Sequence, residues 1–244
     1  EIGKDSLSRD EMYRLIEATI EKAEASDKGL VEMEKDGATV IQLGNYRIAM
    51  TRPPFSEAAE ITAVRPVAKV SLEDYEMSDK LLTRLKTEAE GILVAGAPGH
   101  GKSTFSQALA EYYSSNGQVV KTMENPRDLD VGSDITQYKG LEDSMEDTGD
   151  FLLLARPDYT VFDEVRKTDD FEVFSDMRMA GVGMIGVVHA SEAVDAVQRL
   201  IGRVELGMIP QVCDTVVFIK DAQIEEVYKL ELVVKVPQGM TEED

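Results

Sequence analysis

The sequence has no tryptophan, two histidines and one cysteine among its 244 residues. The lone Cys213 excludes an internal disulfide and fits a reducing compartment, and we interpret it as a small buried apolar residue. No apolar run approaches the roughly 20 residues that span a bilayer, and no basic-then-apolar signal segment is present. We therefore expect a cytoplasmic protein without membrane insertion. Because the first residue is Glu1 rather than Met, we also expect this sequence to be part of a longer chain.

Positive charge is scarce as well. Lys and Arg total 26 against 47 Asp and Glu, so the formal net charge at pH 7 is −21. Such a surface as a whole repels nucleic acid and anionic lipid, although a local basic patch remains compatible with it. Acidity of this degree is typical of a solvated surface rather than of a binding site. We expect any contact with nucleic acid to come from flanking domains or a ring pore, not from the acidic core surface.

What the sequence does contain is a glycine-rich loop between a strand-like run and a helical pattern. Residues 96–104 fill the pattern G-x-x-x-x-G-K-[ST]. Glycines accept backbone angles that are closed to other residues, so successive N–H groups can point at phosphate oxygens. We expect Lys102 to reach the β- and γ-phosphates of ATP and Ser103 to place its hydroxyl on Mg²⁺. The predicted nucleotide site consists of Gly96, Ala97, Pro98, Gly99, His100, Gly101, Lys102, Ser103 and Thr104. Within it, His100 occupies a replaceable position that we expect to be exposed.

Strand and helix patterns divide the sequence into parts. Residues 1–66 combine an amphipathic helix, opened by a Ser8–Glu11 capping box, with a strand meander, and we interpret 67–77 as a linker. From residue 78 to 244 strands and helices alternate as parallel-sheet proteins require. The prediction is an α/β protein with a small α+β N-terminal domain and a RecA-like P-loop ATPase core that ends in a β-hairpin. The strands expected in the core are 92–95, 119–123, 159–163, 184–188, 215–220 and 227–236.

A pair of acidic residues indicates which phosphate chemistry the loop serves. Asp163 and Glu164 follow an apolar strand at its carboxyl end. There Asp163 is suited to hold the water shell of Mg²⁺, and Glu164 is suited to polarise a water for attack on the γ-phosphate. Two solvated acids at a strand end are the ordinary alternative. We expect Glu124, at the end of another strand, to reach the metal or its waters.

Several blocks resemble, in the same order, the secretion and type IV pilus motor ATPases, the group that includes the retraction ATPase PilT. They are the aspartate-box region (122–126), the Arg-x-x-Pro-Asp segment (154–158), the Glu-Ile/Met-Arg stretch (164–166) and the histidine box (186–189). The likeness covers residues 46–220. It implies a ring, most often a hexamer, in which His189 senses the γ-phosphate of ATP.

The resemblance also implies a role for arginines outside the phosphate loop. The family places cationic groups near a nucleotide held at a domain or subunit boundary, which makes Arg47, Arg52 and Arg65 candidates. A guanidinium forms bidentate hydrogen bonds with phosphate oxygens and neutralises charge in the transition state. Arg166 is a further candidate, or alternatively an interface residue. Each of these arginines has an ordinary alternative as a surface ion-pair partner in so acidic a chain.

Some positions depart from the usual family pattern. Asp163 stands where Gly is common, Lys167 where Asp is common, and Val187 where a hydroxyl residue is common. The large helical carboxyl-terminal domain of the pilus members has no counterpart here. These traits resemble the archaeal ATPases in which a PilT-like motor lies between a PIN nuclease-like domain and a KH nucleic-acid-binding domain.

The sequence leaves several functions open. The favoured hypothesis is a motor that binds Mg²⁺-ATP, hydrolyses it and acts on nucleic acid in the full-length protein. The alternative is a type IV pilus, archaellum or secretion motor whose partner is a pilus platform protein. A small-molecule kinase would need an acceptor pocket and an arginine-rich lid, and a nucleotide-dependent interaction module would lack a base such as Glu164.

Overall fold

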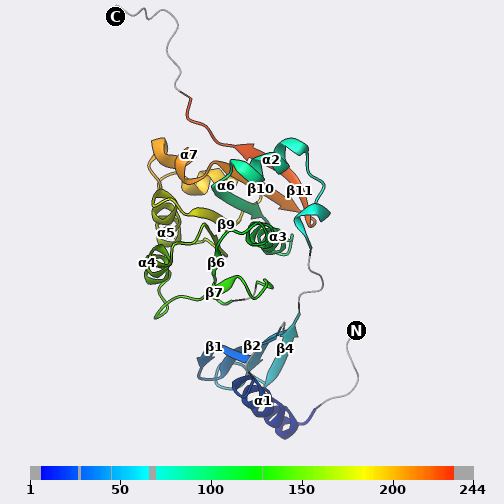
Figure 1. The fold of residues 1–244 in the computed structure, drawn as a ribbon. Helices are drawn as coiled ribbons and strands as arrows, with labels where there is room; N and C mark the ends of the chain where they lie inside the picture. The colour runs from blue at the N-terminus through cyan, green and yellow to red at the C-terminus, as the bar shows by residue number, and fades with distance from the viewer. Residues whose placement is uncertain (1–6, 27–28, 45, 66–69, 128, 234–244) are drawn as a thin grey trace, which may run out of the picture. The chain divides into compact units, whose positions relative to one another are not determined.

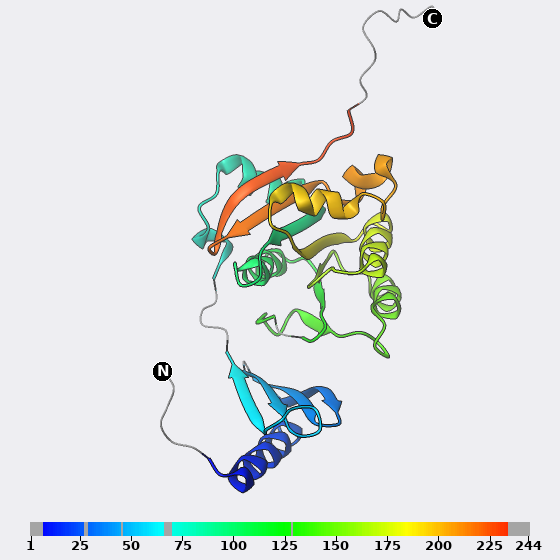
Figure 2. The same cartoon turned by 180° about the vertical axis from the view of Figure 1, so that it is seen from behind.

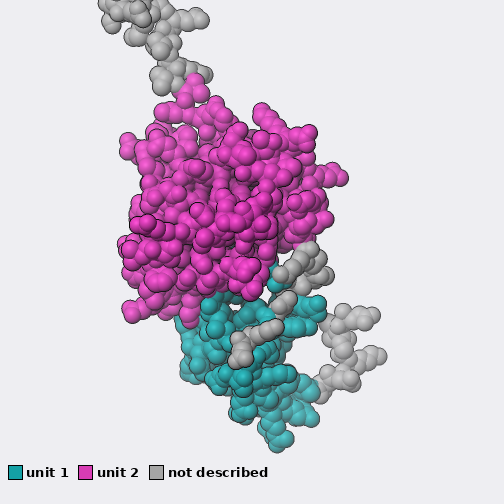
Figure 3. Space-filling view, in the orientation of Figure 1, with its two compact units in different colours: residues 1–69, 124–130 teal, residues 70–123, 131–244 magenta. Residues whose placement is uncertain are grey.

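The computed structural model of the chain describes residues 7–26, 29–44, 46–65, 70–127 and 129–233. Two compact units make up the protein, and Figure 3 colours them separately. Unit 1 holds residues 1–69 and 124–130, and unit 2 holds residues 70–123 and 131–244. The segment 124–130 thus groups with unit 1, whereas the sequence pattern placed it inside the core. None of the helices in the described part of the chain combines the length and apolar character needed to span a bilayer.

Unit 1 is an antiparallel meander of four strands with one helix packed against it (Figure 1). The predicted capping box is confirmed, because Ser8 and Glu11 bond to each other's backbone at the start of helix α1 (Arg9–Glu24). The strands pair in chain order: β1 (Gly29–Lys35), β2 (Ala38–Leu43), β3 (Tyr46–Thr51) and β4 (Glu60–Val64). The small core between helix and sheet consists of Ile16, Ala23, Ile41 and Met50.

Unit 2 is built on a seven-stranded sheet in the order β11-β10-β5-β9-β8-β6-β7. Every pairing is parallel except that of β10 with β11. The strands are β5 (Gly91–Gly96), β6 (Val120–Met123), β7 (Thr136–Tyr138), β8 (Tyr159–Phe162), β9 (Gly183–His189), β10 (Thr215–Lys220) and β11 (Gln223–Lys229). Because parallel strands end at the same edge of a sheet, the residues that follow β5, β8 and β9 gather there.

Helices connect and cover these strands. They are η1 (Leu72–Asp74), α2 (Asp79–Thr87), α3 (Lys102–Ser115), α4 (Met145–Ala155), α5 (Thr168–Met179), α6 (Ala193–Leu200), η2 (Leu206–Met208) and α7 (Ile209–Val212). Ser78 caps α2, since its hydroxyl accepts the amide of Leu81. The expected linker is partly structured, because η1 buries Leu72 and the following Tyr75 contacts the ring of Phe105.

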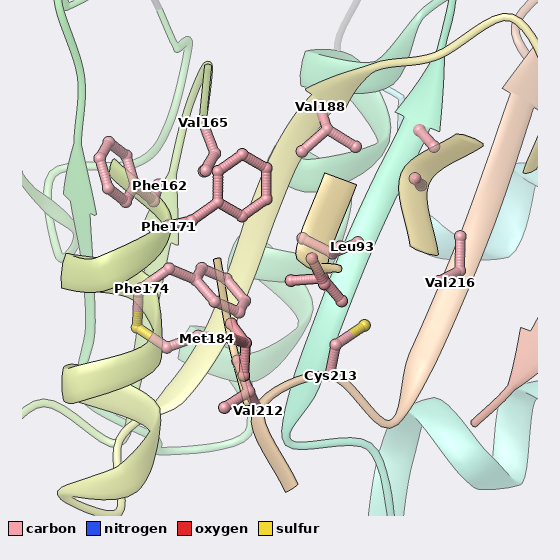
Figure 4. Close-up of a cluster of buried hydrophobic side chains, with 14 of the residues drawn as sticks. Leu93, Phe162, Val165, Phe171, Phe174, Met184, Val188, Val212, Cys213 and Val216 are labelled. Atoms are coloured by element: carbon pink, nitrogen blue, oxygen red, sulfur yellow. The ribbon is translucent and has the colours of Figure 1, made fainter. Parts of the chain in front are cut away.

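The core of unit 2 forms where apolar strands meet the covering helices. Every residue of β5 is buried, as expected for a strand covered on both faces. Figure 4 shows Leu93 of β5 near Phe174 and Met184, with Cys213 in the same cluster. The interpretation of Cys213 as a buried apolar residue is confirmed by its 0% exposure. A Cβ atom on Gly186 of β9 would lie 2.8 Å from the Phe174 ring and 2.9 Å from Leu93, so a side chain at this histidine-box position would displace these neighbours.

The C-terminal hairpin differs from the prediction in its second strand. The bounds of the expected strand at 227–236 are wrong: β11 begins at Gln223, directly after a turn made by Asp221 and Ala222, and ends at Lys229, so the two share only residues 227–229. Figure 2 shows β10 and β11 side by side. The ladder ends at the pair Thr215–Lys229, where β10 itself begins, and just beyond it the amide of Leu230 donates to the carbonyl oxygen of Asp214 at 3.0 Å. Residues 234–236 of the expected strand lie outside the described residues.

Candidate nucleotide-hydrolysis site

The phosphate loop connects the carboxyl end of β5 to the amino end of α3. Gly96, Gly99 and Gly101 have φ angles of 151°, 78° and 90°, which favour glycine. A Cβ atom on Gly96 would lie 2.3 Å from the carbonyl oxygen of Ile219 in β10. The loop therefore needs glycine at this position both for its conformation and for its approach to β10. Helix α3 begins at Lys102, so its amide groups face the loop and favour an anion there.

Lys102 is held inside this loop. Its side chain is largely buried, with 5% exposure, and its Nζ donates to the carbonyl oxygen of Ala97 at 2.8 Å. Burial lowers the pKa of Lys102 from its usual value, while the negative charges of Asp163 and Glu164 act to raise it. The ammonium group thus donates to the loop carbonyl and is influenced by the negative charge of two carboxylates.

Ser103 and Asp163 meet although they are distant in the sequence. The Ser103 hydroxyl donates to Asp163 Oδ1 at 3.1 Å, and Asp163 is only 7% exposed. A hydroxyl and a carboxylate oxygen are ligands that suit Mg²⁺, which keeps several waters and binds phosphate oxygens as well. No group of three or more His, Cys, Asp or Glu side chains within the described ranges is arranged to hold a metal by itself. These donors fit a hydrated Mg²⁺ that arrives with ATP rather than a metal caged by protein.

Glu164 follows Asp163 directly and has a strained backbone conformation. Its φ angle is 64°, which is uncommon for a residue other than glycine and is often found at functional sites. Glu164 Oε1 lies 3.8 Å from His189 Nε2, and Glu164 Oε2 lies 3.3 Å from a guanidinium nitrogen of Arg166. The backbone is tied down as well, because the amide of Val165 donates to the carbonyl oxygen of Val187 at 2.8 Å.

His189 ends strand β9 and pairs in register with Gly96 of the phosphate loop. Burial is the main cause that lowers the pKa of His189 below its usual 6.5, with Lys102 next, while Glu164 opposes the shift. The imidazole is therefore mostly neutral at pH 7. A neutral ring can donate one hydrogen bond and accept another, which suits contact with both a carboxylate and a phosphate or water.

Glu124 follows β6 and is completely buried. Its Oε2 accepts the amide of Leu129 at 2.8 Å, so the carboxylate organises the backbone of segment 124–130. The same segment carries Arg127, whose Nε donates to the buried carboxylate of Glu32 at 3.1 Å within unit 1. A role for Glu124 at the metal stays a prediction.

Arg47, Arg52 and Arg65 belong to unit 1. A guanidinium nitrogen of Arg65 lies 3.4 Å from the Tyr46 hydroxyl, and the guanidinium lies 5.7 Å from the centre of that ring. The backbone of Arg52 pairs with the carbonyl oxygen of Gly37 just after β3. Their approach to a nucleotide stays a prediction.

His100 corrects one expectation from the sequence. Its side chain is 31% exposed rather than free in solvent, and its Nδ1 accepts the amide of Asp221 at 3.0 Å. Its carbonyl oxygen accepts the amide of Ala222 at 3.1 Å. The turn of the β10–β11 hairpin therefore braces the phosphate loop through these two hydrogen bonds. No local signal in the sequence placed this turn against the loop.

Comparison with known proteins shows the family of this chain. Residues 31–225 match the model of the type II/IV secretion system protein family. The chain belongs to this family. The group inferred from the sequence blocks is thereby confirmed. The expected fold, an α/β protein with a RecA-like core and a largely parallel sheet, is confirmed as well.

Two archaeal proteins are similar to the whole chain. A KH- and PIN-domain-containing protein of Methanocaldococcus jannaschii is 65% identical over 243 residues, which cover 100% of this chain and 38% of that protein. The Holliday junction branch migration ATPase PINA of Sulfolobus acidocaldarius is 46% identical over 244 residues, covering 100% of this chain and 48% of that protein. The chain thus spans less than half the length of these relatives.

A solved structure supports the fold. The ATPase DotB of Legionella pneumophila superposes with a TM-score of 0.64 and covers 95% of this chain and 72% of its own. At 16% identity this likeness concerns the fold alone.

Proposed function

We propose that this chain is the Mg²⁺-ATP-hydrolysing motor core of a cytoplasmic, ring-forming protein that acts on nucleic acid. The observation that carries the proposal is the hydrogen bond between Ser103 and Asp163, with Glu164 directly after it. This contact brings a phosphate-loop hydroxyl, a metal-suited carboxylate and a candidate base to one edge of the sheet. A nucleotide-binding module without turnover would have no need of Glu164 in that place.

Each side chain then has a distinct task. Lys102 and the loop amides bind the β- and γ-phosphates, and Ser103 and Asp163 hold Mg²⁺ and its waters. When bound, Mg²⁺ neutralises charge on the phosphate oxygens. Glu164 takes the proton of the attacking water, and neutral His189 orients that carboxylate and reports the γ-phosphate. Arg166 holds the second oxygen of Glu164, which fixes the direction in which the carboxylate accepts the proton.

Two substitutions separate binding from hydrolysis. We expect Glu164→Gln to retain ATP but to lose at least ~100-fold of its turnover, the usual scale for removing a positioned base. Lys102→Ala should weaken ATP binding itself, and serves as the contrasting variant. Binding by calorimetry and phosphate release by a coupled assay distinguish the two effects. Parental turnover in Glu164→Gln would show that another group activates the water.

Ring formation is the second part of the proposal, with a hexamer as the expected state. If Arg52 or Arg65 acts on the nucleotide of a neighbouring subunit, Arg65→Ala should reduce turnover without abolishing ATP binding. Mixing Arg65→Ala subunits with Glu164→Gln subunits should then restore part of the activity, because some sites would combine an intact arginine with an intact base. A monomer by light scattering, with no rescue at any mixing ratio, would contradict the ring.

The nucleic-acid substrate is proposed for the full-length protein. Support comes from the similar proteins, one named as a Holliday junction branch migration ATPase and one as containing KH and PIN domains. Because the charge of −21 opposes binding by the acidic surface, we expect weak duplex binding by this chain alone at physiological salt. The full-length protein should bind DNA or RNA in a salt-sensitive way and hydrolyse ATP faster when bound. Association with a pilus platform protein, without either effect, would favour the secretion or pilus motor instead.

A further inference from the structure

A cavity of about 440 Å³ lies beside the phosphate loop, on the side of helix α6. Its walls include Ala97 and Pro98 of the loop and His189 at the end of β9. They also include Arg199 in the last turn of α6 and Arg203 just after that helix. His189 therefore belongs both to this cavity and to the hydrolysis site, where it faces Glu164. A group that leaves the γ-phosphate position past His189 would enter this cavity.

The charge of the cavity is unusual for so acidic a protein. Neither Arg199 nor Arg203 forms an ion pair with a carboxylate among the described residues, although the sequence has 47 Asp and Glu. Asp195 also lines the cavity, but its Oδ2 already accepts the amides of Ser191 and Glu192 at 3.1 and 3.0 Å. The acidic residue that lines the cavity is thus engaged by backbone donors at the start of α6.

The two guanidinium groups differ in how firmly they are held. Arg203 donates to the carbonyl oxygen of Arg199 at 2.7 Å and to the Thr168 hydroxyl at 3.4 Å, and it lies 5.2 Å from the centre of the Phe171 ring. This anchoring leaves its charge in place at the cavity wall without a carboxylate to neutralise it. Arg199 is close enough to His189 for its charge to contribute to the lowered pKa of the imidazole.

We propose that this cavity is a binding site for the inorganic phosphate that ATP hydrolysis releases, with Arg199 as its principal ligand. The inference rests on the proposed hydrolytic function. In that reaction the water oxygen bonds to the γ-phosphorus, the bridging oxygen leaves with ADP, and Glu164 accepts the water proton. The product is a free oxyanion that guanidinium groups recognise through paired, charge-assisted hydrogen bonds. The site holds this product after it leaves the metal and before it reaches solvent.

The test measures phosphate binding without requiring hydrolysis. Inorganic phosphate is titrated into the ADP-loaded protein and followed by ³¹P NMR, for the parent, Arg199→Gln and the control Arg14→Gln. Arg14 is an exposed residue of α1, so its substitution removes the same charge away from the cavity. We expect Arg199→Gln to weaken phosphate binding about tenfold or more, the usual scale for a lost charge-assisted bond, and Arg14→Gln to leave it unchanged. Equal phosphate affinity in the parent and in Arg199→Gln, with ADP still bound, would overturn the proposal.

A second arm separates free phosphate from the γ-phosphate of intact ATP. ATP affinity is measured in the Glu164→Gln background with and without Arg199→Gln. Unchanged ATP affinity supports a site for the free product, whereas a loss equal to that seen for phosphate would assign Arg199 to the nucleotide and overturn the proposal. A protein that binds phosphate through Arg199 yet hydrolyses no ATP would refute the proposed function and leave the anion site standing.

Discussion

The contact between His100 and the β10–β11 turn allows a quantitative test of how the phosphate loop is held. His100→Ala removes the ring nitrogen that accepts the amide of Asp221 at 3.0 Å. It leaves the backbone bond from Ala222 to residue 100 intact, so the loop loses one of two braces. His100 belongs to the predicted nucleotide site through its place in the loop backbone, and the substitution removes no side chain that we assign to phosphate, metal or water.

The expected size of the effect follows from the exposure of the contact. A net hydrogen bond contributes about 0.5–1.5 kcal/mol to a folded arrangement. Water can replace the lost acceptor here, because the Asp221 side chain is 84% exposed and the His100 side chain 31% exposed. We therefore expect the lower part of the range, about 0.5–1 kcal/mol, which corresponds to at most a two- to fivefold weakening of nucleotide binding at about 1.4 kcal/mol per tenfold.

Calorimetric titration with ADP and steady-state turnover measure this effect directly. The dissociation constant for ADP and the KM for ATP should rise together in His100→Ala, whereas kcat should change little. His100→Asn is the matched variant, because its side-chain oxygen can take the place of Nδ1 and should restore most of the affinity. If His100→Asn binds nucleotide as poorly as His100→Ala does, or if His100→Ala binds as well as the parent protein, then the hairpin turn does not brace the loop.

Two further predictions concern the core of unit 2. Gly186→Ala should lower the free energy of unfolding by about 1–3 kcal/mol, measured by urea denaturation, because the added methyl would lie 2.8 Å from Phe174 and 2.9 Å from Leu93. An unchanged denaturation midpoint would show that these two side chains shift at little energetic cost. Cys213 should resist thiol reagents in the folded protein and react fully in guanidinium chloride, since it is 0% exposed and burial raises the pKa of its thiol to about 12. Rapid labelling under native conditions would mean that this part of the core opens readily.

The sequence by itself determined the features that a contiguous pattern encodes. The glycine spacing of residues 96–101 predicts the phosphate loop, because only glycine adopts its backbone angles and tolerates the approach of β10. Apolar runs closed by acidic or polar residues predict the parallel strands and place Asp163 and Glu164 at a strand end. The Ser8–Glu11 capping box likewise depends on residues within one helical turn.

Other elements carried too little local signal to be found. Strand β7 has three residues, which is too short for a pattern of alternation to emerge. The end of β11 is set by where its partner β10 begins, so its own apolar composition extended the predicted strand too far. The grouping of segment 124–130 with unit 1 depends on Arg127 and the buried Glu32, which are far apart in the chain.

The tertiary structure alone decided which distant residues meet at the site. Strand order places β5 between β10 and β9, and nothing in the local periodicity of these segments specifies that order. From this order follow the bond between Ser103 and Asp163, the brace on His100, and the position of Arg199 beside the phosphate loop. Periodicity reports which face of an element is buried, whereas these contacts depend on how the crossovers arrange the strands in one sheet.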